Sequence, residues 1–153
     1  MLTKRTKYAL LALMHLSKEY GKGPVLISQI AGKEKIPRKF LESILLDLKN
    51  AGILRSKKGK GGGYFLAKPP RDIPMGHVLR ILDGPLAPVP CVSQTAYHKC
   101  EDCQDEVTCG IRLVMKEVRD AIAGVLDKTS FQEAVERVEL ESRDENAGPM
   151  YEI

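Results

Sequence analysis

All four cysteines of this 153-residue chain lie in one stretch, CVSQTAYHKCEDCQDEVTC, as Cys91, Cys100, Cys103 and Cys109. Thiolates are soft ligands that suit iron–sulfur clusters and zinc, and four of them can complete a site unaided. Zinc ribbons usually show two C-x2-C pairs and this stretch shows one, which makes zinc the weaker of the two metals. A metal-free thiol switch, in which Cys100 and Cys103 oxidise to a disulfide, is a third interpretation.

Other side chains of the stretch modify this chemistry. His98 is a reserve ligand, although a histidine in a loop is more often simply exposed. The acidic residues Glu101, Asp102, Asp105 and Glu106 add negative charge, which for a bound cluster should lower the reduction potential. A thioredoxin-like enzyme is not expected, because its motif belongs at a helix start within a βαβ pattern and the sequence shows none.

The length and composition limit what the rest of the chain can be. A chain of 153 residues with 43% apolar residues is one globular domain, or one small domain with an appendage. The apolar run 8–16 follows basic residues, as in a signal peptide, but it ends directly at Lys18 and Glu19 and is too short to span a bilayer. We therefore expect a cytoplasmic protein without a membrane partner, in which clustered cysteines indicate metal or redox chemistry.

The charge is divided between the two halves of the chain. Residues 1–71 carry 16 Lys and Arg against 4 Asp and Glu, a net charge of +12. Residues 72–153 carry 8 against 16, a net charge of −8, which leaves +4 overall. This partition indicates a first half that binds a polyanion and a second half that stays away from it.

The basic half contains a helix-turn-helix pattern. A first helix is expected from about Thr3 to Tyr20, and a short second helix, capped by Ser28, ends near Glu34. Pro37 suits the first turn of a third helix, which Gly52 closes. The buried stripe of the third helix is expected at Phe40, Leu41, Ile44, Leu45 and Leu48. Its exposed side chains that could face a DNA groove are Arg38, Lys39, Glu42, Ser43 and Lys49.

The next segment, ILRSKKGKGGGYFLAK, predicts a hairpin whose strands cover residues 53–56 and 64–67. Lys57, Lys58 and Lys60 lie among glycines at its tip. A nucleotide-binding glycine loop would have to open a helix, and here a strand follows. A lysine-bearing hairpin after a helix-turn-helix is typical of a wing, whose lysines displace counterions from DNA phosphates. Few aromatic residues are available for base stacking, which favours duplex DNA over single strands.

The acidic half predicts helices around the cysteine stretch. A short helix is expected over residues 74–82, followed by a stiff connector at 85–90. A long helix follows Cys109, and its apolar stripe exceeds what one small domain covers, which suggests a partner helix across a two-fold axis. Ser130 and Glu133 form a plausible capping box for a last helix. The tail from Arg143 is expected to fray.

The segments TKYALLAL, IPRKFLESIL, LKNAGIL and GKGGGYFLAKPP, followed by clustered cysteines and a long helix, resemble the Rrf2 family of bacterial winged-helix regulators over about residues 1–135. The resemblance implies a homodimer that binds a palindromic operator with two recognition helices and two wings. It places Arg38, Lys39 and Glu42 on the recognition helix, and Lys58 where a wing residue enters the minor groove. A lysine there would respond to groove width more than to base identity.

The resemblance also favours an iron–sulfur cluster, either 2Fe–2S or 4Fe–4S. Sensing members use three cysteines, the last two separated by five residues, as Cys103 and Cys109 are here. Relatives take a fourth ligand from a histidine three residues after the last cysteine, where this chain has Arg112, or from an acidic residue before YAL, where it has Lys7. Neither can ligate a metal, so Cys100 is the expected fourth ligand.

These observations predict a mainly α-helical protein with a small β wing. Its expected regions are a winged helix-turn-helix over residues 1–84, a linker and cysteine loop over 85–109, the long dimerisation helix and a terminal helix over 110–142, and a disordered tail over 143–153. We expect a transcriptional regulator, with repression as the favoured mode, that senses iron, redox state or nitric oxide. The alternative is a cofactor-free or zinc-bound repressor controlled by thiol oxidation or a protein partner. An enzyme is not expected, because no nucleophile–base pair or open catalytic metal site is visible.

Overall fold

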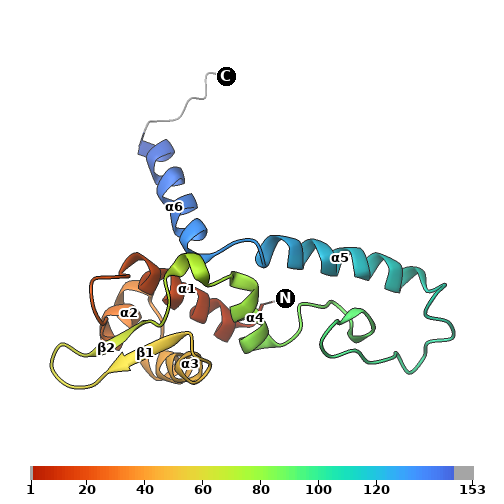
Figure 1. Cartoon of the computed structure of the whole chain (residues 1–153), viewed down its shortest axis with the longest axis horizontal. Coiled ribbons are helices and arrows are strands. Elements are labelled where there is room, and N and C mark those ends of the chain that lie inside the picture. Colours follow the sequence, from red (N-terminus) through yellow and green to blue (C-terminus); the bar gives the residue numbers. More distant parts are fainter. Residues whose placement is uncertain (1, 147–153) are drawn as a thin grey trace.

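The structure, a computed structural model, describes residues 2–146. Six α-helices and one two-stranded antiparallel sheet make up this part of the chain, with short 3-10 turns at Pro70–Asp72 and Pro90–Val92. Figure 1 shows a winged body formed by the first four helices and the sheet, with α5 projecting away from it. The elements are α1 (Lys4–Lys18), α2 (Ile27–Glu34), α3 (Arg38–Asn50), β1 (Leu54–Lys57), β2 (Gly63–Leu66), α4 (Met75–Asp83), α5 (Gly110–Leu126) and α6 (Phe131–Asn146).

One hydrophobic core holds the winged body together. Leu13 and Leu16 of α1 are buried against α3, and Phe131 at the start of α6 is fully buried in the same cluster. The predicted stripe of α3 is confirmed at four positions, namely Leu41, Ile44, Leu45 and Leu48. The prediction for Phe40 is wrong: its ring is 38% exposed and packs edge-on against Tyr8 at a centroid distance of 5.6 Å. Phe40 lies one position before the stripe, so it covers the edge of α1.

Local signals explain where the helices begin and end. Thr3 caps α1, because its hydroxyl accepts the backbone N–H of Thr6 at 3.1 Å. The cap predicted for α2 is wrong: the helix starts one residue before Ser28, and Gln29 Oε1 accepts the backbone N–H of Leu26 at 3.2 Å. The close of α3 is confirmed, since Gly52 has a φ of +81° immediately after the last turn.

The wing is a short hairpin that is hydrogen-bonded to the rest of the winged body. Leu54 pairs with Leu66 and Lys57 with Gly63, each strand lying within one residue of the predicted range. Tyr64 also exchanges two backbone hydrogen bonds of 2.8 Å with Val25, in the connection between α1 and α2. A Cβ at Gly63, where φ is +143°, would lie 2.2 Å from the Val25 carbonyl oxygen. Glycine is therefore required where the wing meets the body.

The second half of the chain leaves the body and returns to it. After α4, the chain runs through the cysteine loop to the outer end of α5, as Figure 1 shows. No residue of α5 is buried. After α5, the chain returns to the winged body. There Met75, at the start of α4, donates its backbone N–H to the carbonyl oxygen of Thr129 at 2.9 Å. Ser130 Oγ accepts the backbone N–H of Glu133 at 3.2 Å, which confirms the hydroxyl half of the predicted capping box.

The last helix extends further than expected. The sequence predicted its end at residue 142 and a tail from Arg143, whereas α6 continues to Asn146. The expected fraying from Arg143 is therefore not seen up to Asn146; in the turn before it, Ser142 donates its hydroxyl to the carbonyl of Val138 at 2.9 Å. The remainder of the predicted tail, residues 147–153, lies outside the described residues.

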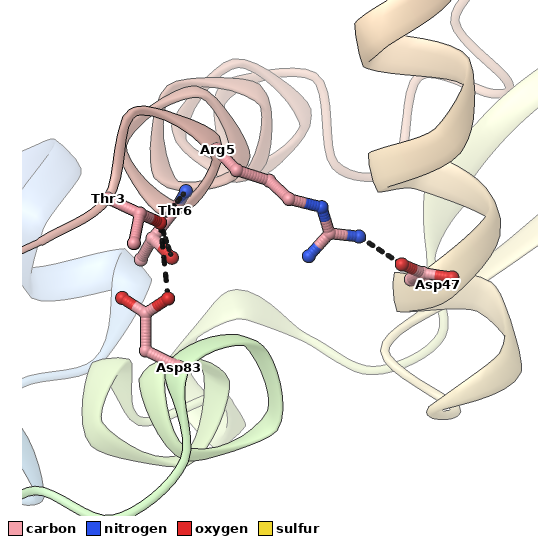
Figure 2. Close-up of polar contacts among 5 residues, drawn as sticks. All are labelled: Thr3, Arg5, Thr6, Asp47 and Asp83. Atoms are coloured by element: carbon pink, nitrogen blue, oxygen red, sulfur yellow. Dashed lines mark hydrogen bonds and ion pairs between the residues drawn. The ribbon is translucent and has the colours of Figure 1, made fainter.

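Two polar contacts of α1 connect elements that are distant in sequence, as Figure 2 shows. Thr3 donates its hydroxyl to Asp83 Oδ1, at the end of α4, over 3.2 Å. Arg5 pairs with Asp47 on α3. Both contacts come from the start of α1. The start of α1 therefore connects the end of α4 to α3, the second helix of the helix-turn-helix.

The predicted fold class, a mainly helical protein with a two-stranded wing, is confirmed. Within residues 2–146, none of the helices has the length and apolar character needed to cross a membrane.

Candidate nucleic-acid surface and cysteine loop

A basic cleft opens between α2, α3 and the wing. It has a volume of 350 Å³, and its cationic lining comes from Arg38 and Lys49 on α3 and from Lys57 and Lys58 on the wing. The hydroxyls of Ser28 and Ser56, and Tyr64, complete its polar wall. Ser28 and Ser56 were not anticipated as site residues, because a single serine carries no charge or spacing signal. Four cations converging from two elements form a surface suited to phosphate oxygens.

The other residues predicted for this surface lie around the cleft. Lys39, Glu42 and Ser43 are exposed on α3, and Lys60 is exposed at the tip of the wing. Glu42 is engaged by Arg38, whose Nε donates to it at 3.3 Å, one helical turn apart. These four side chains do not line the cleft itself, so any contact they make with DNA would lie along the helix and the wing tip.

The four cysteines lie outside the body. Cys100 is exposed and the other three are half-buried, and within the described part of the chain all four are free thiols. Cys109 caps α5, because its sulfur accepts the backbone N–H of Arg112 at 3.5 Å. The opposite end of the loop is held by Arg119 of α5, which donates to the carbonyl oxygen of Val92 at 2.6 Å. Both ends of the cysteine loop are therefore attached to α5.

Two of the acidic residues in the loop have structural roles. Tyr97, between the first two cysteines, donates its hydroxyl to Glu106, between the last two, and so joins the halves of the loop. Asp105 accepts the backbone N–H of Val107 at 3.0 Å and the hydroxyl of Thr108 at 2.9 Å, which folds the turn before α5. The hydrogen bond to Glu106 raises the pKa of Tyr97, so the phenol stays protonated as the donor.

Two properties of the cysteine loop decide whether it could hold a metal group: how close its side chains lie to one another, and their chemistry. Across residues 2–146, no three histidine, cysteine or acidic side chains come close enough together to hold a metal ion. Partial burial, followed by the charge of Glu106, raises the pKa of Cys103, so that this free thiol keeps its proton. The chemistry of the donor set nevertheless fits, since four soft sulfurs lie on one loop that is tied at both ends. Ligation would have to draw the sulfurs together and displace their protons.

A second junction connects α5 to the winged body. Arg80 of α4 donates two hydrogen bonds to Asp127 at the end of α5, at 2.5 and 2.9 Å. Gly76 of α4 makes room for this pair, because a Cβ there would lie 2.1 Å from Asp127 Oδ1. Polar contacts therefore connect the cysteine loop to α5, α5 to α4, and α4 to Thr3 at the start of α1.

Together, the helix-turn-helix, the basic cleft and the attached wing define a winged-helix DNA-binding regulator. The comparisons agree with this class: the family model Rrf2, described as an iron-dependent transcriptional regulator, matches residues 2–137. The chain therefore belongs to the Rrf2 family of transcriptional regulators. It is a DNA-binding regulator rather than an enzyme, as its relatives and fold neighbours are.

Three individual proteins illustrate the likeness. A putative HTH-type transcriptional regulator, rrf2-like, of Rhodobacter capsulatus is 42% identical over 136 residues, which cover 87% of this chain and 91% of that protein. The solved structure of CymR, the global cysteine regulator of B. subtilis, superposes with a TM-score of 0.76 at 29% identity, covering 90% of this chain and 97% of that one. The structure of T. potens IscR gives a TM-score of 0.71 at 25% identity, covering 90% and 88%.

Proposed function

We propose that this protein is a homodimeric repressor that binds a palindromic operator and senses iron, redox state or nitric oxide through an iron–sulfur cluster held by Cys91, Cys100, Cys103 and Cys109. The observation that carries the proposal is the position of α5. The cysteine loop meets this helix at its outer end through Cys109 and again further along through Arg119, and the winged body is bound to its inner end through Asp127. A change in the loop therefore has a direct mechanical route to the DNA-binding elements.

The apolar face of α5 supports the homodimer. Five large apolar side chains on one face of this 17-residue helix are between 37% and 70% exposed, and none of its residues is buried. They are Ile111, Val114, Val118, Ile122 and Val125. A helix this apolar is stable in water only with a covering surface, and a second copy of α5 across a two-fold axis supplies the same stripe. Two copies would place two α3 helices and two wings on one DNA face, which suits a palindrome.

On the DNA, α3 would enter the major groove and the wing would follow the backbone. Arg38, Lys49 and Lys57 would hold phosphates at the basic cleft, and Lys58 would reach from the wing into the minor groove. Lys39, Glu42 and Ser43 would face the major groove along α3. Tyr64 would support the wing, because its backbone joins the hairpin to Val25. Lys60, at the tip, would add charge beyond the cleft.

The bound cluster would supply a redox-active, ligand-sensitive centre, and the chain's part is to hold and tune it. Cys103 and Cys109, from the end of the loop that adjoins α5, and Cys91, from the end fastened by Arg119, would provide three thiolates. Cys100 would provide the fourth. Ordering the loop would bias α5 against α4, and coupling of this kind is typically worth about 1–3 kcal/mol, or roughly 5–150-fold in affinity.

The second candidate is a cofactor-free or zinc-bound repressor controlled by thiol oxidation or a protein partner. The separation of the thiols in the described residues favours its cofactor-free form, as does the likeness to a cysteine regulator. Iron and sulfide analysis of anaerobically purified protein, beside its visible spectrum, separates the two candidates. Brown protein with iron and sulfide supports the cluster. Colourless protein, with stoichiometric zinc or with no metal, supports the second candidate.

A further inference from the structure

One buried polar atom lies beside the cysteine loop without a partner. Among side-chain nitrogens and oxygens of residues 2–146, Arg112 Nε is the one that is shielded from solvent yet makes no hydrogen bond. Buried donors in folded proteins are nearly always satisfied, so an unpaired one indicates an acceptor that has not yet been accounted for. The guanidinium is always charged and has donors only, so the acceptor it lacks should be electron-rich or anionic.

The surroundings of Arg112 show where such an acceptor would lie. The residue is in the first turn of α5, and its backbone N–H already donates to Cys109 Sγ at 3.5 Å. Its charge also acts on the hydroxyl of Tyr97, as do the charges of Glu106 and Cys91. Arg112 therefore contacts Cys109 at the end of the cysteine loop and lies within electrostatic reach of Tyr97 in its middle. One carboxylate oxygen of Glu106 already accepts from Tyr97, and the acceptor that Arg112 already contacts is the sulfur of Cys109.

We propose that Arg112 is a positioning residue for the sulfur-bound group, whose side-chain Nε–H donates a hydrogen bond to a thiolate or sulfide sulfur of that group. The inference rests on the proposed cluster function. It gives Arg112 a role other than ligation, because a guanidinium offers a metal no lone pair. The four cysteines supply the ligands, and Arg112 supplies two N–H groups and a positive charge beside them.

The consequence is electrostatic. Four thiolates give either type of oxidised cluster a net negative charge, and reduction adds one more. A positive charge and an N–H···S hydrogen bond stabilise the more negative form, and so raise the reduction potential. Arg112 would thereby oppose the loop carboxylates, which act in the other direction. Removing its charge should lower the potential without removing a ligand.

The test uses the full chain, purified anaerobically, with the reduction potential followed by visible spectroelectrochemistry. Arg112→Gln should retain iron and sulfide but shift the potential to more negative values. Arg112→Lys keeps a charge without the Nε donor and should shift it less. Lys116→Gln is the matched control, because it removes one positive charge from an exposed position one turn further along α5 and should leave the potential near that of the wild type.

The outcomes separate this inference from the function on which it rests. A wild-type cluster whose potential is the same in Arg112→Gln would overturn the role of Arg112 and leave the cluster standing. An equal shift in Lys116→Gln would also overturn it, since net charge alone would then explain the effect. If Arg112→Gln does not fold or loses its iron, the comparison of Arg112→Lys with the wild type decides. Wild-type protein without iron and sulfide would overturn both proposals.

Discussion

Arg80 and Asp127 join α4 to the end of α5 through two parallel hydrogen bonds of 2.5 and 2.9 Å. This ion pair fastens the helix that carries the cysteine loop to the winged body that carries the basic cleft. Thr3 then connects α4 to α1 through Asp83, and Arg5 connects α1 to α3 through Asp47. The arrangement suggests that α4 is the element through which the state of the loop reaches α3.

The stability contributed by this pair should depend on pH. The hydrogen bond from Arg80 lowers the pKa of Asp127, so the pair stabilises the fold above the usual aspartate pKa, near 4, and its contribution falls as the pH drops further. Asp127 is 42% exposed, so solvent screening limits the contribution to about 1 kcal/mol or less. Asp127→Asn should be less stable than the wild type at pH 6 and nearly equal to it near pH 2, by urea unfolding. A constant difference would contradict this.

Gly76→Ala tests the same pair in a different way. The added methyl group would displace the carboxylate of Asp127, while alanine in the first turn of α4 gains up to about 1 kcal/mol over glycine. The two effects oppose each other, so the unfolding free energy should stay close to that of the wild type, while the part of its pH dependence that comes from Asp127 disappears. Gly124→Ala on α5, where a Cβ meets nothing within 4 Å, is the control, and it should keep the pH dependence.

The wing should contribute to DNA affinity mainly through phosphate charge. Lys58→Ala should weaken binding with little regard to base identity, because a lysine in the minor groove responds to its potential. It should also reduce the slope of log affinity against log salt by about 2 per dimer, one cation for each wing. Fluorescence anisotropy at several salt concentrations measures this slope. Lys128→Ala, which removes an exposed lysine from the acidic half, should leave the slope unchanged. Equal effects of the two substitutions would show that net charge, not the wing, governs binding.

Dimerisation through α5 predicts that a charge on its apolar face separates the subunits. Val118 is 38% exposed, and Val118→Glu should give monomers in sedimentation velocity at concentrations where the wild type is dimeric. Its operator affinity should fall with the loss of the second half-site. Val138→Glu, at a 44% exposed position on α6, is a comparable change away from α5 and should remain dimeric. A dimeric Val118→Glu protein would contradict the assignment of the interface.

Ligation by four cysteines predicts that Cys100 is needed and His98 is not. Cys100→Ser should reduce the iron and sulfide retained after anaerobic purification, because a hydroxyl is a poor ligand for iron in a cluster. His98→Ala should retain as much as the wild type. The opposite pattern would make the histidine the fourth ligand.

The sequence predicted the elements of this protein well and their tertiary contacts poorly. The stripe from Leu41 to Leu48 and the turn at Gly52 depend on neighbouring residues, so periodicity and glycine chemistry were sufficient to find them. The exposure of Phe40 was not predictable in this way, because it depends on where Tyr8 of another helix lies. Likewise the continuation of α6 to Asn146 was not predicted, because no apolar residue follows Leu140 within the helix to mark its last turn.

The residues of the candidate sites also differ in whether the sequence alone could reveal them. The lysines of the wing and the four cysteines were proposed as site residues from residue type and spacing. Arg119 and Asp127 were not, since each acts on a residue more than 25 positions away that only the fold brings near. Ser28 and Ser56 line the basic cleft for the same reason. Charge and sulfur patterns thus indicate the chemistry, and the contacts that position it are visible only in the structure.

The most direct test of the account compares the operator affinity of metal-loaded and metal-stripped protein. Both forms are titrated anaerobically, at one salt concentration, against a duplex from the region upstream of the gene. Coupling through α5 predicts affinities that differ roughly 5–150-fold between the two forms, and a smaller ratio in Asp127→Asn. Equal affinities of the loaded and stripped wild-type protein would contradict the claim that the cysteine loop controls DNA binding.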